Sequence, residues 1–331
     1  MTDVIRNHSP RLAALFHLWL RGDFARHFDA VRTAGPGRSL LAPCQPVAKI
    51  LRRSKADESP STERSQSHKE EARGQTMRID HHLEKRAPAG AAQAAGELIQ
   101  LTRDGSSFAM GSYDGPVLVY TNHPSWWDPV HFMLLAHHVM PGRRLFGPFD
   151  AEALQKYRFF RRLGAFPVER NSRRGAATFL RTSRAILQEP GTSLWITAQG
   201  EFEDPRQRPV VLRPGVAHLA RRLDSGVVIP LALEYPFWNE RRPEALSYFG
   251  EPIPLGNDPG VSVEAWNQRL AKGLGESMDA LAELTQRRDP DAFHTLLQGR
   301  TGIGGPYDAW RRLVSWSRGQ RFQASHGGSP R

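Results

Sequence analysis

The sequence predicts an α/β protein with a mixed or largely parallel central sheet flanked by helices, an αβα sandwich. Apolar runs typical of buried strands alternate with amphipathic helical patterns from about residue 116 to residue 287. Polar residues and glycine follow several of these runs, as they do at the carboxyl ends of strands in α/β proteins. The 331 residues are 39% hydrophobic, which is sufficient to bury the core of one sizeable domain.

The first segment, residues 1–33, predicts one or two short amphipathic helices over 11–32. Apolar side chains recur there at helical spacing: Leu12, Leu15, Phe16, Trp19, Leu20, Phe24, Phe28 and Val31. Such a helix can pack on the folded domain, or it can lie in a membrane interface with its aromatic side chains toward lipid. The two arrangements are compatible.

The N-terminus predicts neither a secretory signal nor a membrane span. The apolar stretch from Leu12 to Leu20 is interrupted by His17 and is about half the length that a bilayer requires. Cys44 is the only cysteine, so an intramolecular disulfide and a cysteine-rich metal site are excluded. We therefore expect a cytoplasmic protein that is peripheral on the inner face of the cell membrane.

Residues 34–115 predict a low-complexity insert or linker. The stretch 52–75 mixes both charges with serines and has almost no large apolar residue, so it cannot bury enough surface to offset its ordering entropy. Residues 87–101 are alanine-rich and favour a short helix within the insert.

The folded body is expected over residues 116–290. Its predicted strands are 117–121, 165–168, 193–197 and 227–234. Its predicted helices are about 125–138, 152–163, 175–188, 215–222 and 263–287. The C-terminal tail, 291–331, contains a glycine-rich turn and a short amphipathic piece.

The charge balance favours an anionic partner. The chain has 45 Lys+Arg and 34 Asp+Glu, a formal net charge of +11, which attracts anionic lipid, phosphorylated ligands or nucleic acid. A nucleic-acid recognition motif is lacking, and we therefore expect no nucleic-acid partner.

The strongest chemical signal follows the first predicted strand, where His123 is followed five residues later by Asp128. If Ser125 caps the next helix, Asp128 lies in its first turn and can reach back to the imidazole. A carboxylate on one ring nitrogen leaves the other free to take a proton from a hydroxyl. The alternative is purely structural, because Ser125-x-x-Asp128 is also a capping box.

Two further segments place polar groups after predicted strands. Arg170 ends the second strand, and its planar guanidinium can bind phosphate or carboxylate, although it can also belong to an ordinary solvated basic surface. Gln199 and Glu201 follow the third strand and can accept hydrogen bonds from hydroxyls, and Gly200 between them permits close backbone approach. A simple glycine turn explains this loop nearly as well.

These segments, in this order, resemble the phospholipid/glycerol acyltransferase family, best known for 1-acylglycerol-3-phosphate O-acyltransferase. The resemblance covers roughly residues 116–255. The first family motif is a histidine, four residues and an acid, matched by His123 to Asp128 with the preceding Asn122. The remaining matches are Gly164, Phe166 and Arg170; Gln199, Gly200 and Glu201; and Val228, Ile229, Pro230 and Leu231.

The resemblance implies an O-acyltransferase with the acyltransferase αβα sandwich, His123 as general base and Asp128 as its orienting partner. It implies a substrate-binding role for the other residues of the first three motifs: Asn122, Gly164, Phe166, Arg170, Gln199, Gly200 and Glu201. Arg170 would bind an acceptor phosphate. The donor would be acyl-CoA or acyl-carrier protein, a substrate rather than a cofactor, and no cofactor or metal is expected.

The third motif departs from the family pattern. Gln199 stands where the family usually has glutamate, and no threonine-arginine pair follows Gly200. The acceptor can therefore be a lysophospholipid, or a neutral amphipathic alcohol such as a glycolipid or glycosylated terpenoid. A different class of function is a catalytically silent protein that binds lipids or anions; the intact His123/Asp128 pair favours catalysis.

Overall fold

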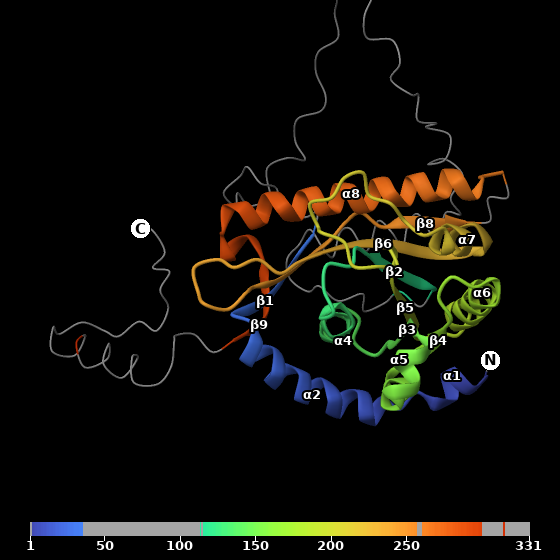
Figure 1. The fold of residues 1–331 in the computed structure, drawn as a ribbon, viewed down its shortest axis with the longest axis horizontal. Coiled ribbons are helices and arrows are strands. Elements are labelled where there is room, and N and C mark those ends of the chain that lie inside the picture. The colour runs from blue at the N-terminus through green and yellow to red at the C-terminus, as the bar shows by residue number, and fades with distance from the viewer. Residues whose placement is uncertain (1, 36–112, 114, 257–259, 300–313, 315–331) are drawn as a thin grey trace, which may run out of the picture. The chain divides into compact units, whose positions relative to one another are not determined.

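The computed structural model describes residues 2–35, 113, 115–256, 260–299 and 314 (Figure 1). The predicted insert 34–115, with its helix at 87–101, lies almost entirely outside these residues, as does the tail beyond residue 299 apart from residue 314.

One sheet organises the described chain, and its strand order is β4-β3-β5-β2-β6-β7-β1-β9, with β8 also paired to β6. Strands β4, β3, β5, β2 and β6 are parallel, whereas β7 and β8 run antiparallel to β6. The strands are β1 (Ala30–Ala34), β2 (Val117–Thr121), β3 (Arg144–Asp150), β4 (Ala165–Val168), β5 (Thr192–Thr197), β6 (Ser225–Glu234), β7 (Ala245–Phe249), β8 (Ile253–Gly256) and β9 (His294–Gln298). The predicted mixed, largely parallel sheet is confirmed.

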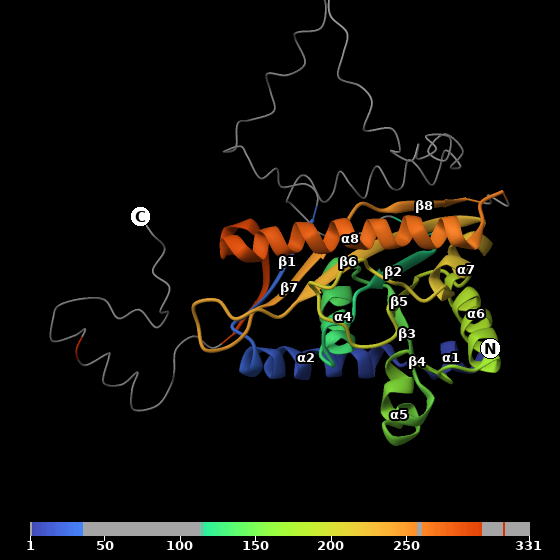
Figure 2. The ribbon, with the colours of Figure 1, turned by 45° about the horizontal axis from the view of Figure 1, so that its top comes forward.

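Helices cover both faces of the sheet. They are α1 (Thr2–Asn7), α2 (Pro10–His27), α4 (Asp128–Val139), α5 (Ala151–Lys156), α6 (Arg173–Leu187), α7 (Gly215–Arg222) and α8 (Val263–Arg287), with short 3-10 turns η2 (Arg158–Leu163) and η3 (Pro290–Ala292). Figures 1 and 2 show α8 along one side of the sheet and α2 and α4 on the other.

The side chains of β2 explain why both faces are covered. All five residues of β2 are buried. Leu118 and Tyr120 belong to the core beneath α7 and α8, whereas Val117 and Val119 belong to the core beneath α4. Successive side chains of a strand point to opposite faces, so a central strand without polar alternation requires an apolar layer on each side.

The predicted helices and strands of the body are largely confirmed, with two corrections. The predicted helix 152–163 is interrupted: α5 ends at Lys156, and the 3-10 turn η2 follows. The sheet also includes strands that were not predicted, β3, β7 and β8 within the body and β9 in the segment assigned to the tail.

The N-terminal segment is helical only in part. α2 begins at Pro10, where the Ser9 hydroxyl accepts a hydrogen bond from the Leu12 N–H at 3.3 Å, and ends at His27. Residues 30–34, expected to continue the helical segment, instead form β1, because they pair in parallel with β7 and antiparallel with β9. This segment therefore contributes a strand to the sheet.

Among the described helices, none combines the length and the apolar character needed to cross a bilayer.

Candidate functional site

The parallel strands bring three chain segments together at one edge of the sheet. β2 lies between β5 and β6, with Thr121 opposite Thr197 on one side and Leu231 on the other. The segments that follow these strands therefore emerge at the same edge, where α/β proteins place their ligands. They carry His123 after β2, Gln199 after β5 and Tyr235 after β6.

His123 and Asp128 form a close pair. The His123 Nδ1 atom lies 2.6 Å from the Asp128 Oδ2 atom, and the Asp128 side chain is fully buried whereas the imidazole is 14% exposed. Because a carboxylate is an acceptor, Nδ1 carries the proton and donates it. The Nε2 atom is then the proton-accepting nitrogen, on a side chain that retains access to solvent.

Three donors surround the Asp128 carboxylate. Oδ2 also accepts the Ser125 backbone N–H at 3.2 Å, and Oδ1 accepts the Tyr235 hydroxyl at 2.8 Å. Burial raises the pKa of Asp128, while the hydrogen bonds from His123, Tyr235 and Ser125 oppose that rise. The donors therefore stabilise the charge that orients the imidazole.

The capping interpretation is half correct. α4 begins at Asp128 rather than at Ser125, and the residue before it, Trp127, makes no side-chain cap. The Ser125 hydroxyl accepts the Trp127 N–H at 3.2 Å. The Asp128 carboxylate does reach back to the Ser125 N–H, as in a capping box, but the same Oδ2 atom also holds His123.

The loop after β5 fixes the backbone of His123 from both sides. The His123 N–H donates to Gln199 Oε1 at 2.8 Å, and the His123 carbonyl accepts the Glu203 N–H at 3.1 Å. Gln199 Nε2 in turn donates to Glu203 Oε2 at 2.6 Å. An amide is required for this arrangement because Gln199 donates and accepts at once, whereas an ionised glutamate could not donate to Glu203.

The same loop approaches the predicted anion-binding segment. Gly200 has φ of +78°, and a side chain there would collide with the Arg213 side chain. Arg213 donates to Asn171 Oδ1 at 3.1 Å, next to Arg170. The loops after β4 and β5 are thus joined through Arg213.

Arg170 and Glu201 are both exposed. The Arg170 side chain is 69% exposed, and its Nε atom lies 3.0 Å from Asp150 Oδ2 at the end of the neighbouring strand β3. An exposed pair of this kind is weak and can exchange Asp150 for a ligand anion. The structure therefore leaves the Arg170 guanidinium accessible to a ligand.

Asn122, Gly164 and Phe166, for which substrate contacts are expected, occupy interior positions. The Asn122 amide is buried and bonded to Leu233, donating to its carbonyl at 3.0 Å and accepting from its N–H at 2.8 Å. Gly164 has φ of +104°, and a side chain there would collide with the Leu145 carbonyl. Phe166 lies in the core. These residues support the backbone that carries the site.

Two residues of the site were not predicted, Tyr235 and His131. Tyr235 directly follows β6, so its position after a predicted parallel strand was the available signal. His131 lies three residues after Asp128 on α4, and its Nδ1 atom is 3.2 Å from the Tyr235 hydroxyl. That helical spacing places both side chains on one face of α4.

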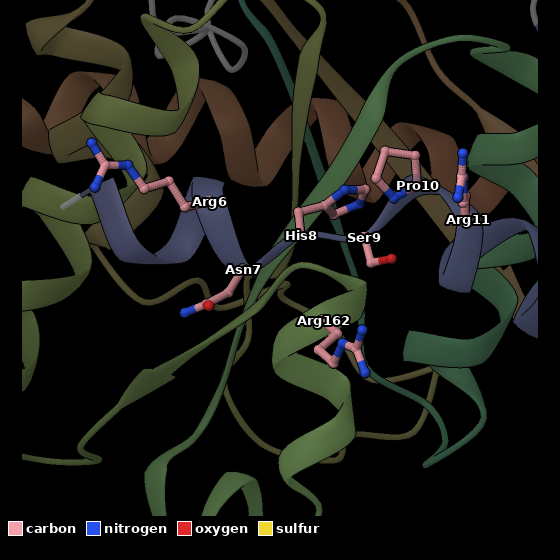
Figure 3. Close-up of a pocket in the computed structure, with 7 residues that line it drawn as sticks. All are labelled: Arg6, Asn7, His8, Ser9, Pro10, Arg11 and Arg162. Carbon is pink, nitrogen blue, oxygen red and sulfur yellow. The ribbon is translucent and has the colours of Figure 1, made fainter.

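A cavity of about 580 Å³ lies elsewhere, at the junction of α1, α2 and η2 (Figure 3). It contains none of the predicted site residues, and Arg162 in its wall precedes β4, at the opposite edge of the sheet from His123. Figure 3 shows the side chains of Arg6, Arg11 and Arg162 pointing in different directions. Within the described residues, no cluster of histidine, cysteine or acidic side chains is arranged to hold a metal ion.

Of three comparisons with known proteins, the match to a family model agrees with the family resemblance. A comparison with curated proteins found no match. Among solved structures, the chain is similar to the 1-acyl-sn-glycerophosphate (LPA) acyltransferase PlsC from Thermotoga maritima, at 12% identity and a TM-score of 0.35, over 58% of this chain and 79% of that one. The family model described as Acyltransferase matches residues 80–234, a range that includes His123, Asp128, Arg170 and Gly200. The range matched by the family model therefore includes all four motifs on which the sequence resemblance rests.

Proposed function

We propose that the protein transfers a fatty acyl group from a thioester, acyl-CoA or acyl-carrier protein, to the hydroxyl of a lysophospholipid or a related amphipathic alcohol. The observation that carries this proposal is the 2.6 Å contact between His123 Nδ1 and the buried Asp128 carboxylate. It leaves His123 Nε2 as a base at the edge of the sheet where the three site loops meet.

The proposed reaction needs no covalent enzyme intermediate. His123 Nε2 takes the proton of the acceptor hydroxyl as its oxygen attacks the thioester carbonyl carbon. The tetrahedral intermediate then collapses, the carbon–sulfur bond breaks, and the imidazolium returns the proton to the departing thiolate. An ester and a free thiol are released, and Asp128 stabilises the transient imidazolium throughout.

Apolar side chains beside His123 fit an acyl chain. The Phe202 ring centroid lies 4.4 Å from that of His123, and the Phe202 side chain is 62% exposed. Trp126, two residues before Asp128, is 64% exposed. Exposed aromatic rings at a polar site are consistent with an amphipathic substrate.

A second apolar surface favours a membrane as the place where the acceptor is met. We define the α2–η2 surface as the exposed side chains Leu15, Leu18, Trp19, Tyr157 and Phe159. Its two parts are joined by Phe16, whose ring centroid lies 5.3 Å from that of Trp19 and 5.6 Å from that of Phe159. Arg158, Arg161 and Arg162 are exposed on η2. Apolar side chains bordered by arginines are typical of proteins that lie on anionic bilayers.

Vesicle flotation tests the membrane proposal. The double variant Leu18→Ala/Trp19→Ala should float with anionic vesicles at least about tenfold less than the unmodified protein, because it removes apolar area that the bilayer would bury. Phe237→Ala is the matched control, since Phe237 is 64% exposed but lies outside the α2–η2 surface. Salt should weaken the binding of the unmodified protein without abolishing it. Equal flotation of the double variant and the control would contradict the proposal.

An acyl-transfer assay tests the catalytic proposal. The purified protein should convert a radiolabelled acyl thioester and one member of a panel of amphipathic alcohols into a labelled ester. The panel contains lysophosphatidate, lysophosphatidylcholine and a neutral glycolipid, each offered with acyl-CoA and with acyl-carrier protein. Absence of any labelled ester, with a folded protein and vesicles present, would favour a catalytically silent binding protein.

A further inference from the structure

The hydrogen bonds around Asp128 continue beyond the pair to Tyr235 and His131. The Tyr235 hydroxyl lies 2.8 Å from Asp128 Oδ1 and 3.2 Å from His131 Nδ1. A carboxylate only accepts, so the hydroxyl donates its proton to Asp128. Its lone pair then accepts from His131, which assigns the His131 proton to Nδ1.

Burial keeps His131 neutral, so its single ring proton donates to the Tyr235 hydroxyl. The His131 side chain is fully buried, and its pKa is lowered to about 3 because burial disfavours the charged ring. With its proton on Nδ1, the buried Nε2 atom has no hydrogen-bond partner among the described residues. The hydrogen bond of the neutral ring is therefore the one that Nδ1 donates to Tyr235.

The scaffold holds both residues in place. His131 lies one turn beyond Asp128 on α4, and Tyr235 directly follows β6. Tyr235 packs against the Phe28 ring at 5.7 Å between centroids and against the His131 ring at 5.8 Å. Burial and the negative charge of Asp128 raise the pKa of Tyr235 well above its usual range, so the phenol keeps its proton.

We propose that Tyr235 and His131 are positioning residues that hold the Asp128 carboxylate ionised and aimed at His123, and thereby set the pH range in which His123 acts as a base. The catalytic part of this inference rests on the proposed function. The chain runs from His131 through Tyr235 and Asp128 to His123, and both positioning residues act through Asp128.

The charged neighbours are few. Asp128 is the group among the described residues whose charge acts on Tyr235, and His123 is the group whose charge acts on Asp128. Burial accounts for the behaviour of His131. Other titratable groups on the packed segments include Asp23, Arg26 and His27 of α2, Glu203 after β5, Glu234 at the end of β6, and Glu244, whose backbone N–H donates to the Pro236 carbonyl.

Removing the Tyr235 hydroxyl should raise the pH at which the protonated His123–Asp128 pair loses the proton on His123 Nε2. When His123 is neutral, the pair carries the unbalanced negative charge of the Asp128 carboxylate, which loses one of its three donors in Tyr235→Phe. The protonated pair is nearly neutral and loses less. The midpoint therefore moves up, by about half a pH unit or more, which is about a threefold increase in proton affinity.

The experiment compares Tyr235→Phe with Tyr120→Phe. The Tyr120 hydroxyl donates to the Leu270 carbonyl at 2.9 Å and belongs to the core on the other face of the sheet. Both variants remove one buried phenol O–H donor, but only the Tyr235 hydroxyl donates to Asp128, and it also accepts from His131. The titration midpoint of the pair is followed by NMR of the imidazole nitrogens, and the acid limb of kcat/KM is recorded in the acyl-transfer assay.

We expect both readouts to move to higher pH in Tyr235→Phe and to stay in place in Tyr120→Phe. His131→Leu should produce a smaller shift of the same sign, and His131→Asn should restore the midpoint because its amide can donate in place of Nδ1. The histidine variants also supply the test if Tyr235→Phe does not fold. Unchanged midpoints in Tyr235→Phe or His131→Leu would overturn the inference. The NMR titration requires no turnover, so the titration midpoint can be measured even if the protein does not catalyse the proposed acyl transfer.

Discussion

At the scale of residues, Asp128 has two roles that the sequence presents as alternatives. Its Oδ2 atom holds both the His123 imidazole and the Ser125 N–H, so the carboxylate that begins α4 also orients the proposed base. The sequence predicts this pair because both residues lie in the short segment that joins a strand to the first turn of the next helix. Tyr235 could not be paired with Asp128 in the same way, because the two are 107 residues apart and meet only when β2 and β6 pair.

We predict that Asp128→Asn lowers kcat by about 100-fold or more, because an amide neither fixes the His123 tautomer nor stabilises the imidazolium. Steady-state kinetics and thermal unfolding are measured together. Ser125→Ala is the matched control, since it removes the hydroxyl that accepts from Trp127 but keeps the backbone donor to Asp128. If Asp128→Asn and Ser125→Ala both lost only thermal stability, Asp128 would be a helix cap alone.

Arg170 separates a phosphate-bearing acceptor from a neutral one. If the acceptor phosphate displaces Asp150 from the guanidinium, Arg170→Ala should reduce kcat/KM toward lysophosphatidate by about 30-fold or more, which corresponds to about 2 kcal/mol. Arg170→Lys should recover only part of this activity, because a point charge cannot replace the planar guanidinium. Activity toward a neutral glycolipid should fall much less. Equal losses on the two acceptors would eliminate the phosphate-binding role.

At the scale of elements, α2 is attached to α4 through histidines. His17 of α2 is buried, and its ring centroid lies 3.6 Å from that of His137. The pKa of His17 is lowered to about 4 by burial and by the neighbouring His137, His138 and Arg21. The folded protein therefore resists protonation of this ring, which would place charge inside the α2–α4 contact.

This contact predicts a pH-dependent stability. Unfolded His17 takes up a proton near pH 6.5, whereas the folded side chain does so only near pH 4, so unfolding takes up a proton between these values and stability is lost as the pH falls through that window. The free energy of unfolding of the unmodified protein should decrease between pH 7 and pH 5. In His17→Phe this decrease should be smaller by about 1 kcal/mol. Urea titrations at both pH values measure it, with the exposed His27→Phe as control. An identical decrease in all three proteins would show that His17 does not carry the effect.

The elements also show where prediction from sequence ends. The bounds of α7 and α8, and those of β2 and β4, are those predicted, because continuous periodicity or a bounded apolar run marks each of them locally. β1 was missed because its five residues follow a helix and owe their strand conformation to β7 and β9, more than 200 residues later. β3 was missed because Gly147 and Pro148 interrupt its apolar run.

At the scale of the whole molecule, the sheet assembles the site from distant segments. His123, Gln199 and Tyr235 each follow a different parallel strand, and their backbone and side-chain bonds converge on one histidine. The acyltransferase family match includes the first two of these positions, whereas Tyr235 lies one residue beyond it. His123, on which these bonds converge, is therefore the residue that the proposed chemistry depends on most.

The most direct test is the rate of ester formation by His123→Ala, measured with the best donor and acceptor of the panel. We predict a loss of about two to four orders of magnitude in kcat, because the variant removes the proposed base. The fold should be unchanged, because backbone hydrogen bonds from residue 123 to Gln199 and Glu203 hold the loop. Circular dichroism and thermal unfolding establish that the variant is folded. A folded His123→Ala protein that forms ester within a few-fold of the unmodified rate would contradict the account.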